Sequence, residues 1–331
     1  MSILIIAEAG VNHNGDVKTA IKLIESAAIA GADIVKFQTF KPEALVSKFA
    51  QKAAYQKEVT SKNESQLEMI RRLTLPEVSY PLLVRCCEDN GVAFLSTPFD
   101  LESVDFLNGI NQPFWKVPSG EITNLPLLIK MASTGKQVLL SSGMSTLEEI
   151  EAAVNILKGS GSGEVIVLHC TTEYPAPLED VNLCAMDTIR QKLGLRVGYS
   201  DHTIGIEVAI AAAALGAVVI EKHFTLDKTM EGPDHKASLV PEELGAMIKS
   251  IRNVEVALGS KVKAPTASER KNMTVARKSV VASRCIKQGE LLTQENITIK
   301  RPGCGVSPMR WFEVLGTKAI RDFEEDELIE L

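Results

Sequence analysis

Side chains of catalytic types recur along this sequence wherever a short apolar run ends. In chain order they are Glu8; Lys36 and Gln38; Ser96 and Thr97; Lys116, Ser119 and Glu121; Ser141 and Ser142; His169, Thr171 and Thr172; Ser200, Asp201 and His202; and Glu221, Lys222 and His223. One polar residue at a strand end means little, but recurrence after every run is difficult to explain structurally. If the runs are parallel strands of one barrel, these side chains converge on the face where barrel enzymes have their active sites. The sequence therefore predicts an active site.

Two histidines are candidate metal ligands, because His202 and His223 end consecutive runs. Neighbouring strands lie about 4.8 Å apart, so both imidazoles could reach one ion. Two histidines with open coordination positions suit a divalent metal such as Mn, Zn or Fe. One histidine alone is more often a hydrogen-bonded structural residue, so the interpretation depends on the pair. Asp201 is predicted to orient one of the rings.

Two lysines, Lys36 and Lys116, supply positive charge at the ends of the second and fourth runs. Lysines beside small hydroxyl donors form a cradle for phosphate and carboxylate groups. The alternative is a Schiff-base lysine, as in aldolases that condense pyruvate. Anion binding is favoured by the serines near the lysines, namely Ser119, Ser141, Ser142 and Ser200.

Glu121 and Glu8 are the candidate general acid and base groups. A carboxylate among lysines should stay ionised at neutral pH, which suits electrostatic stabilisation or proton abstraction. For Glu8 the alternative is a structural salt bridge to a lysine at the barrel mouth.

The elements that must position these residues alternate between strand-like and helix-like segments. Asp16 and the pattern Ser145-x-x-Glu148 signal helix N-termini, and Pro241 opens the last long helix. Eight such units predict a (β/α)8 TIM barrel over residues 1–259, with a doubly wound open sheet as the alternative. The predicted strands span residues 3–7, 34–37, 93–96, 115–118, 138–141, 165–169, 196–199 and 218–222.

Three further segments differ from this repeating pattern. Residues 41–62 form an unusually long connection, which predicts a lid or binding loop, with a merely mobile excursion as a nearly equal alternative. Residues 260–278 are polar and charged and are predicted to be a linker. Residues 279–331 contain short apolar runs and turns, and we expect a small β-rich second domain there.

The composition excludes several classes of protein. Lys and Arg total 36 against 42 Asp and Glu, so the net charge of −6 gives no electrostatic basis for binding nucleic acid or an anionic membrane. The six cysteines show no paired metal spacing, and adjacent Cys86 and Cys87 are unlike a secreted disulfide framework. The N-terminus lacks the features of a signal peptide, and no apolar stretch is long enough to span a bilayer. We therefore expect a reduced, cytoplasmic protein.

Ordered motifs along essentially the whole chain make this sequence resemble the sialic acid synthase family. In the tail, Lys300-Arg301-Pro302-Gly303 resembles the signature of that family's antifreeze-like (SAF) domain. The barrel motifs are Ala7-Glu8-Ala9-Gly10-Val11-Asn12-His13-Asn14-Gly15, Val35-Lys36-Phe37-Gln38-Thr39, Ser96-Thr97-Pro98-Phe99, Lys116-Val117-Pro118-Ser119-Gly120-Glu121, Ser142-Gly143-Met144, His169-Cys170-Thr171, Tyr174-Pro175, Ser200-Asp201-His202-Thr203, Glu221-Lys222-His223-Phe224-Thr225 and Gly232-Pro233-Asp234-His235.

The resemblance implies a transferase that condenses phosphoenolpyruvate with an N-acetylated amino-sugar aldehyde and water. Phosphate would leave with C–O bond cleavage. The acceptor would be N-acetylmannosamine or 2,4-diacetamido-2,4,6-trideoxymannose, and the product N-acetylneuraminate or N,N'-diacetyllegionaminate. Several barrel motifs look closest to the legionaminate branch and the tail looks equally like N-acetylneuraminate synthases, so both sugars stay open.

The resemblance also implies roles for single residues. His202 and His223 would bind a divalent metal, commonly Mn²⁺, with Mg²⁺ or Co²⁺ as alternatives, and Glu121 would lie near the reacting aldehyde. Relatives often have asparagine at the position of Thr172, which leaves a contact there open. Phosphoenolpyruvate would be held by Lys36, Lys116, Ser119, Ser142 and Ser200. The amino sugar would contact Gln38, Tyr174, Asp234 and, in a domain-swapped homodimer, Arg301 of the partner subunit.

Two other functions compete with this one. A Schiff-base pyruvate aldolase would use one of the barrel lysines covalently and would need no metal. A non-catalytic ice- or carbohydrate-binding protein would use the tail domain on an inert barrel. The complete polar rim of the barrel and the charged pair Lys300-Arg301 disfavour the second alternative.

Overall fold

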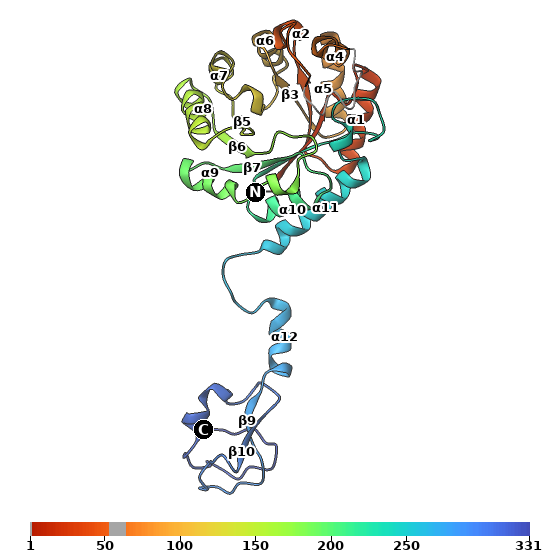
Figure 1. The fold of residues 1–331 in the computed structure, drawn as a ribbon. Coiled ribbons are helices and arrows are strands. Elements are labelled where there is room, and N and C mark those ends of the chain that lie inside the picture. Colours follow the sequence, from red (N-terminus) through yellow and green to blue (C-terminus); the bar gives the residue numbers. More distant parts are fainter. Residues whose placement is uncertain (1, 53–63) are drawn as a thin grey trace. The chain divides into compact units, whose positions relative to one another are not determined.

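The computed structural model of the protein describes residues 2–52 and 64–331. The chain folds into two compact units, Met1–Gly259 and Ser260–Leu331. Figure 1 shows the elements of each unit.

The first unit is a barrel of eight parallel strands surrounded by helices (Figure 1). The hydrogen-bonded order is β3-β2-β1-β8-β7-β6-β5-β4, and β3 and β4 at its two ends also contact each other. Each strand therefore neighbours the next one along the chain, as in a barrel and unlike a doubly wound sheet. The predicted TIM barrel is confirmed. The strands are β1 (Leu4–Gly10), β2 (Ile34–Thr39), β3 (Ala93–Pro98), β4 (Trp115–Val117), β5 (Val138–Ser141), β6 (Val165–His169), β7 (Val197–Asp201) and β8 (Val219–His223).

Every second side chain of each strand points into the barrel, and these side chains form two layers. One buried apolar cluster comprises Ile6, Ile34, Leu95, Phe114, Leu139, Ile166, Leu168 and Val219. Successive side chains of a strand point to opposite faces, so a residue two positions later points to the same side. In most strands that residue is polar, namely Glu8, Lys36, Thr97, Lys116, Ser141 and Glu221. An apolar layer inside the barrel therefore lies beneath a polar layer near the strand ends.

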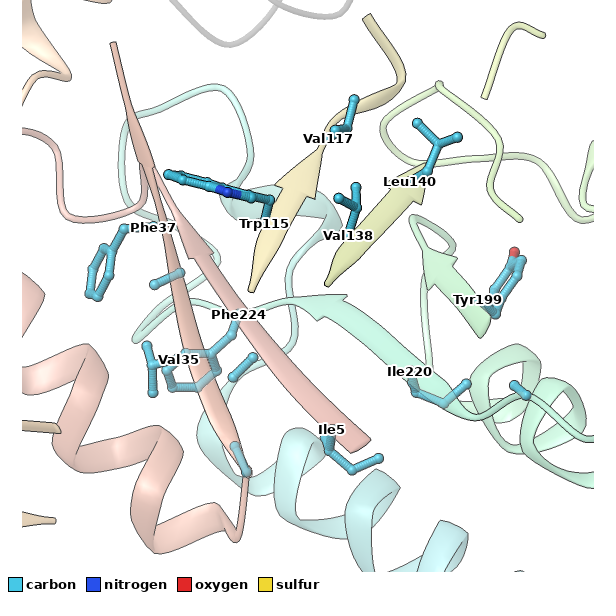
Figure 2. Packing of buried hydrophobic residues seen from close by; sticks show 14 of the residues in the cluster. Ile5, Val35, Phe37, Trp115, Val117, Val138, Leu140, Tyr199, Ile220 and Phe224 are labelled. Carbon is cyan, nitrogen blue, oxygen red and sulfur yellow. The ribbon is translucent and has the colours of Figure 1, made fainter. Parts of the chain in front are cut away.

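The other faces of the strands pack against the helices in the largest apolar cluster. Figure 2 shows Val35, Trp115 and Phe224 within this cluster. Their side chains are fully buried, as expected for parallel strands that are covered on both faces.

The helices begin where the local sequence satisfies their first backbone N–H groups. Helix α1 (Val17–Ala30) starts after Asp16, whose carboxylate accepts hydrogen bonds from the N–H groups of Lys18 and Thr19. Helix α8 (Leu147–Gly159) has a capping box, but it is formed by Thr146 and Glu149. The prediction of Ser145 and Glu148 was therefore wrong by one residue. Ser145 and Thr146 are each followed by a glutamate three residues later, so the sequence pattern fits both and only the fold selects Thr146.

The remaining helices of the first unit surround the barrel. In the part of the chain that the structure describes, no helix is long and apolar enough to cross a membrane. Helix α11 begins with Pro241 at its first position, as predicted. These helices are α2 (Pro42–Leu45), α4 (Gln66–Arg72), α5 (Tyr80–Asp89), α6 (Leu101–Ile110), α7 (Leu125–Ala132), α9 (Ala185–Leu193), α10 (Glu207–Ala214) and α11 (Pro241–Leu258).

The long connection after β2 contributes a small apolar cluster of its own. It contains α2 and is followed by α4, and its residues 53–63 lie outside the described part of the chain. The cluster comprises Val11, Phe40, Val46, Met69, Ile70 and Leu73, with Leu45, Ala50 and Phe99 packed against it. The prediction of a lid over residues 41–62 falls partly on the undescribed residues and stays a prediction.

The second unit begins with a helix where a linker was predicted. Helix α12 (Ala267–Ala276) has a capping box made by Thr266 and Glu269, but no buried residue. Because it has no apolar face, the sequence carried no periodic signal for it. The unit continues with the antiparallel strands β9 (Ser279–Ala282) and β10 (Ile297–Lys300), and the short helix α13 (Trp311–Val314). Its core contains Val280, Ala282, Ile286, Leu292, Ile297, Val314, Ala319, Phe323 and Ile329.

Candidate active site

A cavity of about 270 Å³ lies at the C-terminal ends of the barrel strands. Its lining contains most of the predicted site residues and divides into a polar part and an apolar part. The polar lining residues are Glu8, Lys36, Gln38, Thr97, Lys116, Ser119, Ser141, Thr172, Tyr174, Ser200, His202, Glu221, His223 and Asp234. The apolar lining residues are Val11, Phe40, Leu45, Met69, Ile70, Leu73, Phe99, Pro118 and Pro233.

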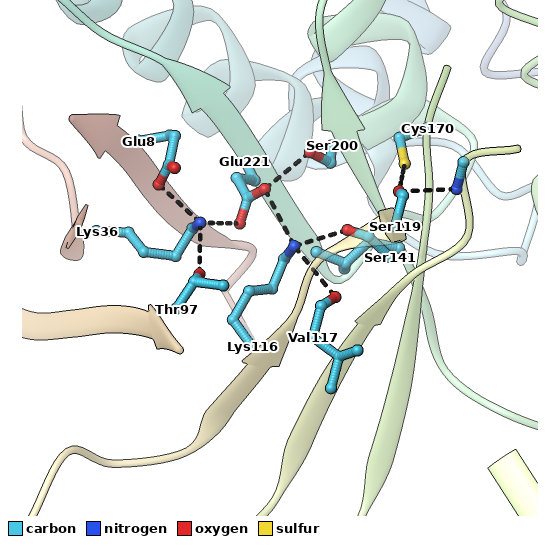
Figure 3. A network of polar contacts seen from close by, with 12 residues as sticks. Glu8, Lys36, Thr97, Lys116, Val117, Ser119, Ser141, Cys170, Ser200 and Glu221 are labelled. Carbon is cyan, nitrogen blue, oxygen red and sulfur yellow. Dashed lines mark hydrogen bonds and ion pairs between the residues drawn. The ribbon is translucent and has the colours of Figure 1, made fainter. Parts of the chain in front are cut away.

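Two buried lysines share one carboxylate at the base of this cavity (Figure 3). The Nζ atoms of Lys36 and Lys116 each lie 3.5 Å from a different oxygen of Glu221. Glu8 forms a second and closer ion pair with Lys36, at 2.7 Å. Two ammonium groups therefore face two carboxylates, and all four side chains are at most 5% exposed. The network is therefore electrically neutral when both carboxyl groups are ionised, and protonation of Glu8 leaves it one positive charge in excess.

Hydroxyl groups complete the hydrogen bonds of this network. Lys36 donates to Thr97 Oγ1 at 3.1 Å and Lys116 donates to Ser141 Oγ at 2.7 Å. Ser200 Oγ donates to Glu221 at 2.8 Å. Small hydroxyls beside cations are the groups that a phosphate or carboxylate ligand would use.

The two carboxyl groups differ in how readily they take up a proton. Burial raises the pKa of Glu8, and the opposing effect of Lys36 does not overcome it. Burial also acts to raise the pKa of Glu221, but Lys116 and Lys36 outweigh it and hold that pKa at about 2. Glu221 is therefore ionised at neutral pH, whereas Glu8 is the carboxyl better suited to carry a proton.

The two lysines differ in the same way. Burial acts to lower the pKa of Lys36, but its carboxylate partners outweigh burial and the pKa is raised. Burial lowers the pKa of Lys116 despite the nearby Glu221. Lys116 is therefore the lysine with more of the neutral character that a Schiff base requires.

The predicted histidine pair lies together in the cavity. The ring centroids of His202 and His223 are 5.5 Å apart, and the ring of Tyr174 lies 4.3 Å and 5.5 Å from them. His202 Nδ1 is 2.5 Å from the carbonyl oxygen of Thr171. A carbonyl only accepts, so Nδ1 carries the proton and Nε2 keeps its lone pair.

The donor set of this pair fits a divalent metal ion. Burial lowers the pKa of His202 to about 4 and that of His223 well below its usual value, so both rings are neutral and able to coordinate. His223 Nδ1 is buried without a hydrogen-bond partner and lies 3.8 Å from Asp234 Oδ2. Among the described residues no group of three or more His, Cys, Asp and Glu side chains could hold a metal. An ion here would need oxygen ligands from substrate or water.

Asp201 does not orient a histidine directly, which corrects the prediction. Its carboxylate forms a buried ion pair with Lys222 at 2.8 Å and accepts hydrogen bonds from the backbone and hydroxyl of Thr203. The Thr171 carbonyl holds the His202 ring instead. Strand pairing explains this, because Asp201 and Lys222 are register partners on β7 and β8.

Ser119 is held at the cavity wall by neighbouring residues. Its Oγ accepts a hydrogen bond from the N–H of Gly143 at 2.9 Å and lies 3.2 Å from Cys170 Sγ. A Cβ atom at Gly143 would lie 2.1 Å from Thr172 Oγ1, so glycine is required for this close approach.

Gln38 and Asp234 line the part of the cavity nearest Glu8. Gln38 Nε2 donates to Glu8 Oε1 at 3.1 Å. Burial, with a further contribution from Glu8, raises the pKa of Asp234 to about 7. The Cα of Gly10 packs against all three side chains, since a Cβ there would lie within 3.7 Å of each.

Three predicted site residues are not among the lining residues of this cavity. Glu121 lies on the 3-10 turn Ser119–Glu121, and its carboxylate accepts a hydrogen bond from Asn124 Nδ2 at 2.6 Å. Ser142 donates to the carbonyl oxygen of Leu168 and lines a neighbouring cavity between β5, β6, α8 and α9. Arg301 belongs to the second unit, where its Nε donates to the carbonyl oxygen of Ala276 at 3.1 Å.

Sequence reasoning noted Glu221 and Thr97 at strand ends but assigned them no role, and it named Ser141 only among the serines that favour anion binding. The available signal was strand alternation: each follows an apolar barrel-interior residue by two positions, so each points to the interior. The same rule places Ser142, the residue assigned in place of Ser141, on the other face.

Comparisons with known proteins find relatives of both units of this chain. The NeuB family model matches residues 23–263, and the SAF domain model matches residues 277–330. The N,N'-diacetyllegionaminic acid synthase of Campylobacter jejuni is 53% identical over 328 residues, covering 98% of both chains. The human N-acetylneuraminate-9-phosphate synthase is 40% identical, covering 98% of this chain and 90% of that one. The crystal structure of an N-acetylneuraminic acid (sialic acid) synthetase from Leptospira borgpetersenii, in complex with citrate, matches 82% of this chain and 90% of its own with a TM-score of 0.73 at 34% identity.

Proposed function

Because the chain belongs to the NeuB family, we propose that it is a nonulosonate synthase. It condenses phosphoenolpyruvate with the aldehyde of an N-acetylated amino sugar and water, giving a nine-carbon keto acid and phosphate. The observation that carries this proposal is the cavity itself, which combines two hydroxyl-supported lysines with two neutral histidines. Cations suit the anionic donor, and neutral imidazoles suit a metal that activates an aldehyde.

Lys36 and Lys116 bind the phosphate and carboxylate of phosphoenolpyruvate in this proposal. To do so they exchange part of their contact with Glu8 and Glu221 for the ligand. Ser119, Ser200 and Thr97 supply hydroxyl donors from the same wall. Ser142 remains a weaker candidate because its hydroxyl bonds the backbone of β6.

His202 and His223 hold a divalent cation in this proposal, with Mn²⁺ first and Mg²⁺ or Co²⁺ as alternatives. The neutral rings and the unpartnered Nδ1 of His223 support it. When such a cation is bound, the sugar's aldehyde oxygen is polarised and its carbon becomes a better electrophile.

The bond changes then follow from the chemistry of the two substrates. The C3 methylene of phosphoenolpyruvate bonds to the aldehyde carbon, and the carbonyl electron pair moves to the aldehyde oxygen. That oxygen takes a proton from Glu8, the carboxyl whose pKa burial raises. Water adds to the cationic C2 and returns a proton to Glu8. The tetrahedral C2 then breaks its bond to the phosphate oxygen, and hydrogen phosphate leaves with the hydroxyl proton.

Glu121 is the second candidate for stabilising the cationic C2 or guiding the water. Its neighbours Ser119 and Gly120 line the cavity, and its carboxylate is held by Asn124. If Glu121→Gln keeps undiminished turnover, Glu121 has no part in the mechanism. The same result for Glu8→Gln would exclude Glu8.

The acceptor that we propose is 2,4-diacetamido-2,4,6-trideoxymannose, with N-acetylmannosamine as the alternative. The apolar wall of the cavity supports this choice, because a methyl group gains from apolar contact and a hydroxyl group loses hydrogen bonds there. An apolar pocket distinguishes such pairs by about 10²-fold at most. The 53% identical Campylobacter jejuni relative is named as a synthase of the corresponding diacetylated product.

We further propose a domain-swapped homodimer in the cytoplasm. Arg301 is exposed on the second unit, so Arg301 of the partner subunit could contact the acyl group of the sugar. All six cysteines are free thiols, which is typical of a reducing compartment.

The experiment that tests the proposed function is release of phosphate from phosphoenolpyruvate. Each sugar is offered separately, with Mn²⁺ and with EDTA. Release that requires metal and one of the sugars supports the proposal, and failure with both sugars on folded, metal-loaded protein contradicts it. Borohydride trapping of Lys116 with pyruvate, together with activity in EDTA, would instead establish the aldolase.

A further inference from the structure

The loop that carries Asp234 into the cavity is closed at its neck. Phe224 and Leu239 form an isolated bridge where the loop leaves β8 and returns to α11. The Phe224 N–H also donates to the carbonyl oxygen of Glu8 at 2.8 Å. Asp234 lies between these ends, so the neck fixes where the loop begins and ends.

One buried amide from another loop clamps both sides of this neck. Asn12 follows β1, is 1% exposed, and uses both N–H groups of its side chain. Its Nδ2 donates to the carbonyl oxygen of Phe224 at 2.8 Å and to Ser238 Oγ at 2.9 Å. The Ser238 hydroxyl then donates to the carbonyl oxygen of Asp234 at 2.7 Å. A continuous hydrogen-bonded chain therefore runs from Asn12 to the backbone of Asp234.

A second amide of the same motif holds the outer part of the loop. Asn14 Nδ2 donates to the carbonyl oxygen of Glu231 at 2.8 Å and lies 3.4 Å from His235 Nε2. These two contacts lie on either side of Asp234 along the chain. Asn12 and Asn14 are not among the residues that line the cavity. The function proposed above therefore gives these two asparagines no role.

The Asp234 carboxylate depends on this backbone support. No hydrogen bond to its oxygens is found within the described residues, and Nδ1 of the neutral His223 ring lies 3.8 Å from Oδ2. We infer that Asn12, acting through Ser238, is a positioning residue that holds Asp234 against the acceptor sugar. This inference rests on the proposed function, in which the lysines contact phosphoenolpyruvate, and on the sugar contact that the family resemblance implies for Asp234.

The test compares two hydroxyl deletions in the same loop. Ser238→Ala breaks the chain to Asp234, whereas Thr229→Ala removes an exposed hydroxyl that donates to Asp227. We expect Ser238→Ala to raise the KM of the sugar about tenfold, the size of one buried hydrogen bond, and to change the KM of phosphoenolpyruvate by less than about twofold. Thr229→Ala should change neither. If Ser238→Ala is unstable, Ser238→Cys keeps the volume with a weaker donor and should shift the sugar KM in the same direction.

A double-mutant cycle separates positioning from general loss of structure. In an Asp234→Ala background, Ser238→Ala should leave the sugar KM unchanged, because the group that it positions is absent. Equal effects in both backgrounds, or equal rises in both substrate KM values, would overturn the inference while wild-type activity upholds the proposed function. Wild-type protein that releases no phosphate with either sugar would overturn both.

Discussion

At the scale of single residues, the site depends on two lysines that share one carboxylate. Glu221 is ionised and lies between Lys36 and Lys116. Its negative charge therefore offsets part of the positive charge of the lysines, which an anionic substrate needs for binding. It also accepts a hydrogen bond from Ser200, which keeps it in place. Its main effect on the ground state is therefore electrostatic.

This arrangement predicts the sign of a binding change. We expect Glu221→Gln to bind phosphoenolpyruvate about tenfold more tightly, because a neutral amide no longer competes for the lysines. Lys116→Met should weaken the same binding by about tenfold or more. Calorimetric titration without acceptor measures both, with Glu148→Gln on the exposed start of α8 as control. Weaker binding by Glu221→Gln would show instead that the carboxylate is needed to hold the lysines in position.

A second residue-scale prediction concerns stability against pH. Burial lowers the pKa of His13 to about 4 from 6.5. Above pH 6.5 both the folded and the unfolded states are neutral; as pH falls from 6.5 towards 4, only the unfolded state binds the proton, so stability is lost in that window. Between pH 7 and pH 5 this amounts to about 2 kcal/mol.

The check is urea unfolding of wild type and His13→Gln at both pH values. The free energy of unfolding should fall by about 2 kcal/mol less between pH 7 and pH 5 in the variant. An identical fall in both proteins would mean that other groups carry the acid sensitivity.

At the scale of elements, strands fix the reacting groups and the segment after β2 shapes the acceptor end. Met69 and Ile70 of α4 are buried against Phe40 and Val11 and line the cavity with them. In the proposed function, selectivity among sugars would therefore depend on this long connection and on α4, whereas the lysines and histidines are held by the barrel strands.

This division predicts a change of preference without loss of chemistry. Met69→Gln keeps the length of the side chain and places an amide in the apolar wall. The kcat/KM ratio of N-acetylmannosamine to the trideoxy sugar should rise about tenfold, within the range available to such pockets. Phosphate release with each sugar measures it, with Leu82→Gln, half exposed on α5, as control. An unchanged ratio would mean that the wall does not contact the part of the sugar that differs.

At the scale of the whole molecule, the barrel and the second unit each have their own apolar core. The proposed role of Arg301 requires the second unit of one subunit to complete the cavity of the other. In this proposal the reason for their covalent connection is functional, because the second unit carries Arg301.

Subunit complementation tests the swap. Lys116→Ala damages the barrel site and Arg301→Ala damages the tail, and each variant alone should have little activity. After unfolding and refolding as a mixture, swapped heterodimers contain one intact site, so about a quarter of wild-type activity should return. If mixed dimers form but activity does not return, each chain serves its own site. If Arg301→Ala weakens the binding of both substrates equally, Arg301 does not make the proposed contact with the sugar.

The sequence by itself determined the barrel, its strands and most of the lining residues, because strand periodicity and helix signals are local and the C-terminal ends of parallel strands meet on one face. Strand alternation separates Ser141 from Ser142 only once the interior residues of β5 are known, and the tertiary structure identified those residues and paired Asp201 with Lys222. Those outcomes depend on strand register and on which residue of an adjacent pair points inward, and a shift of one residue reverses them. The clamp from Asn12 to Asp234 joins residues 222 positions apart, and no local pattern records such a contact.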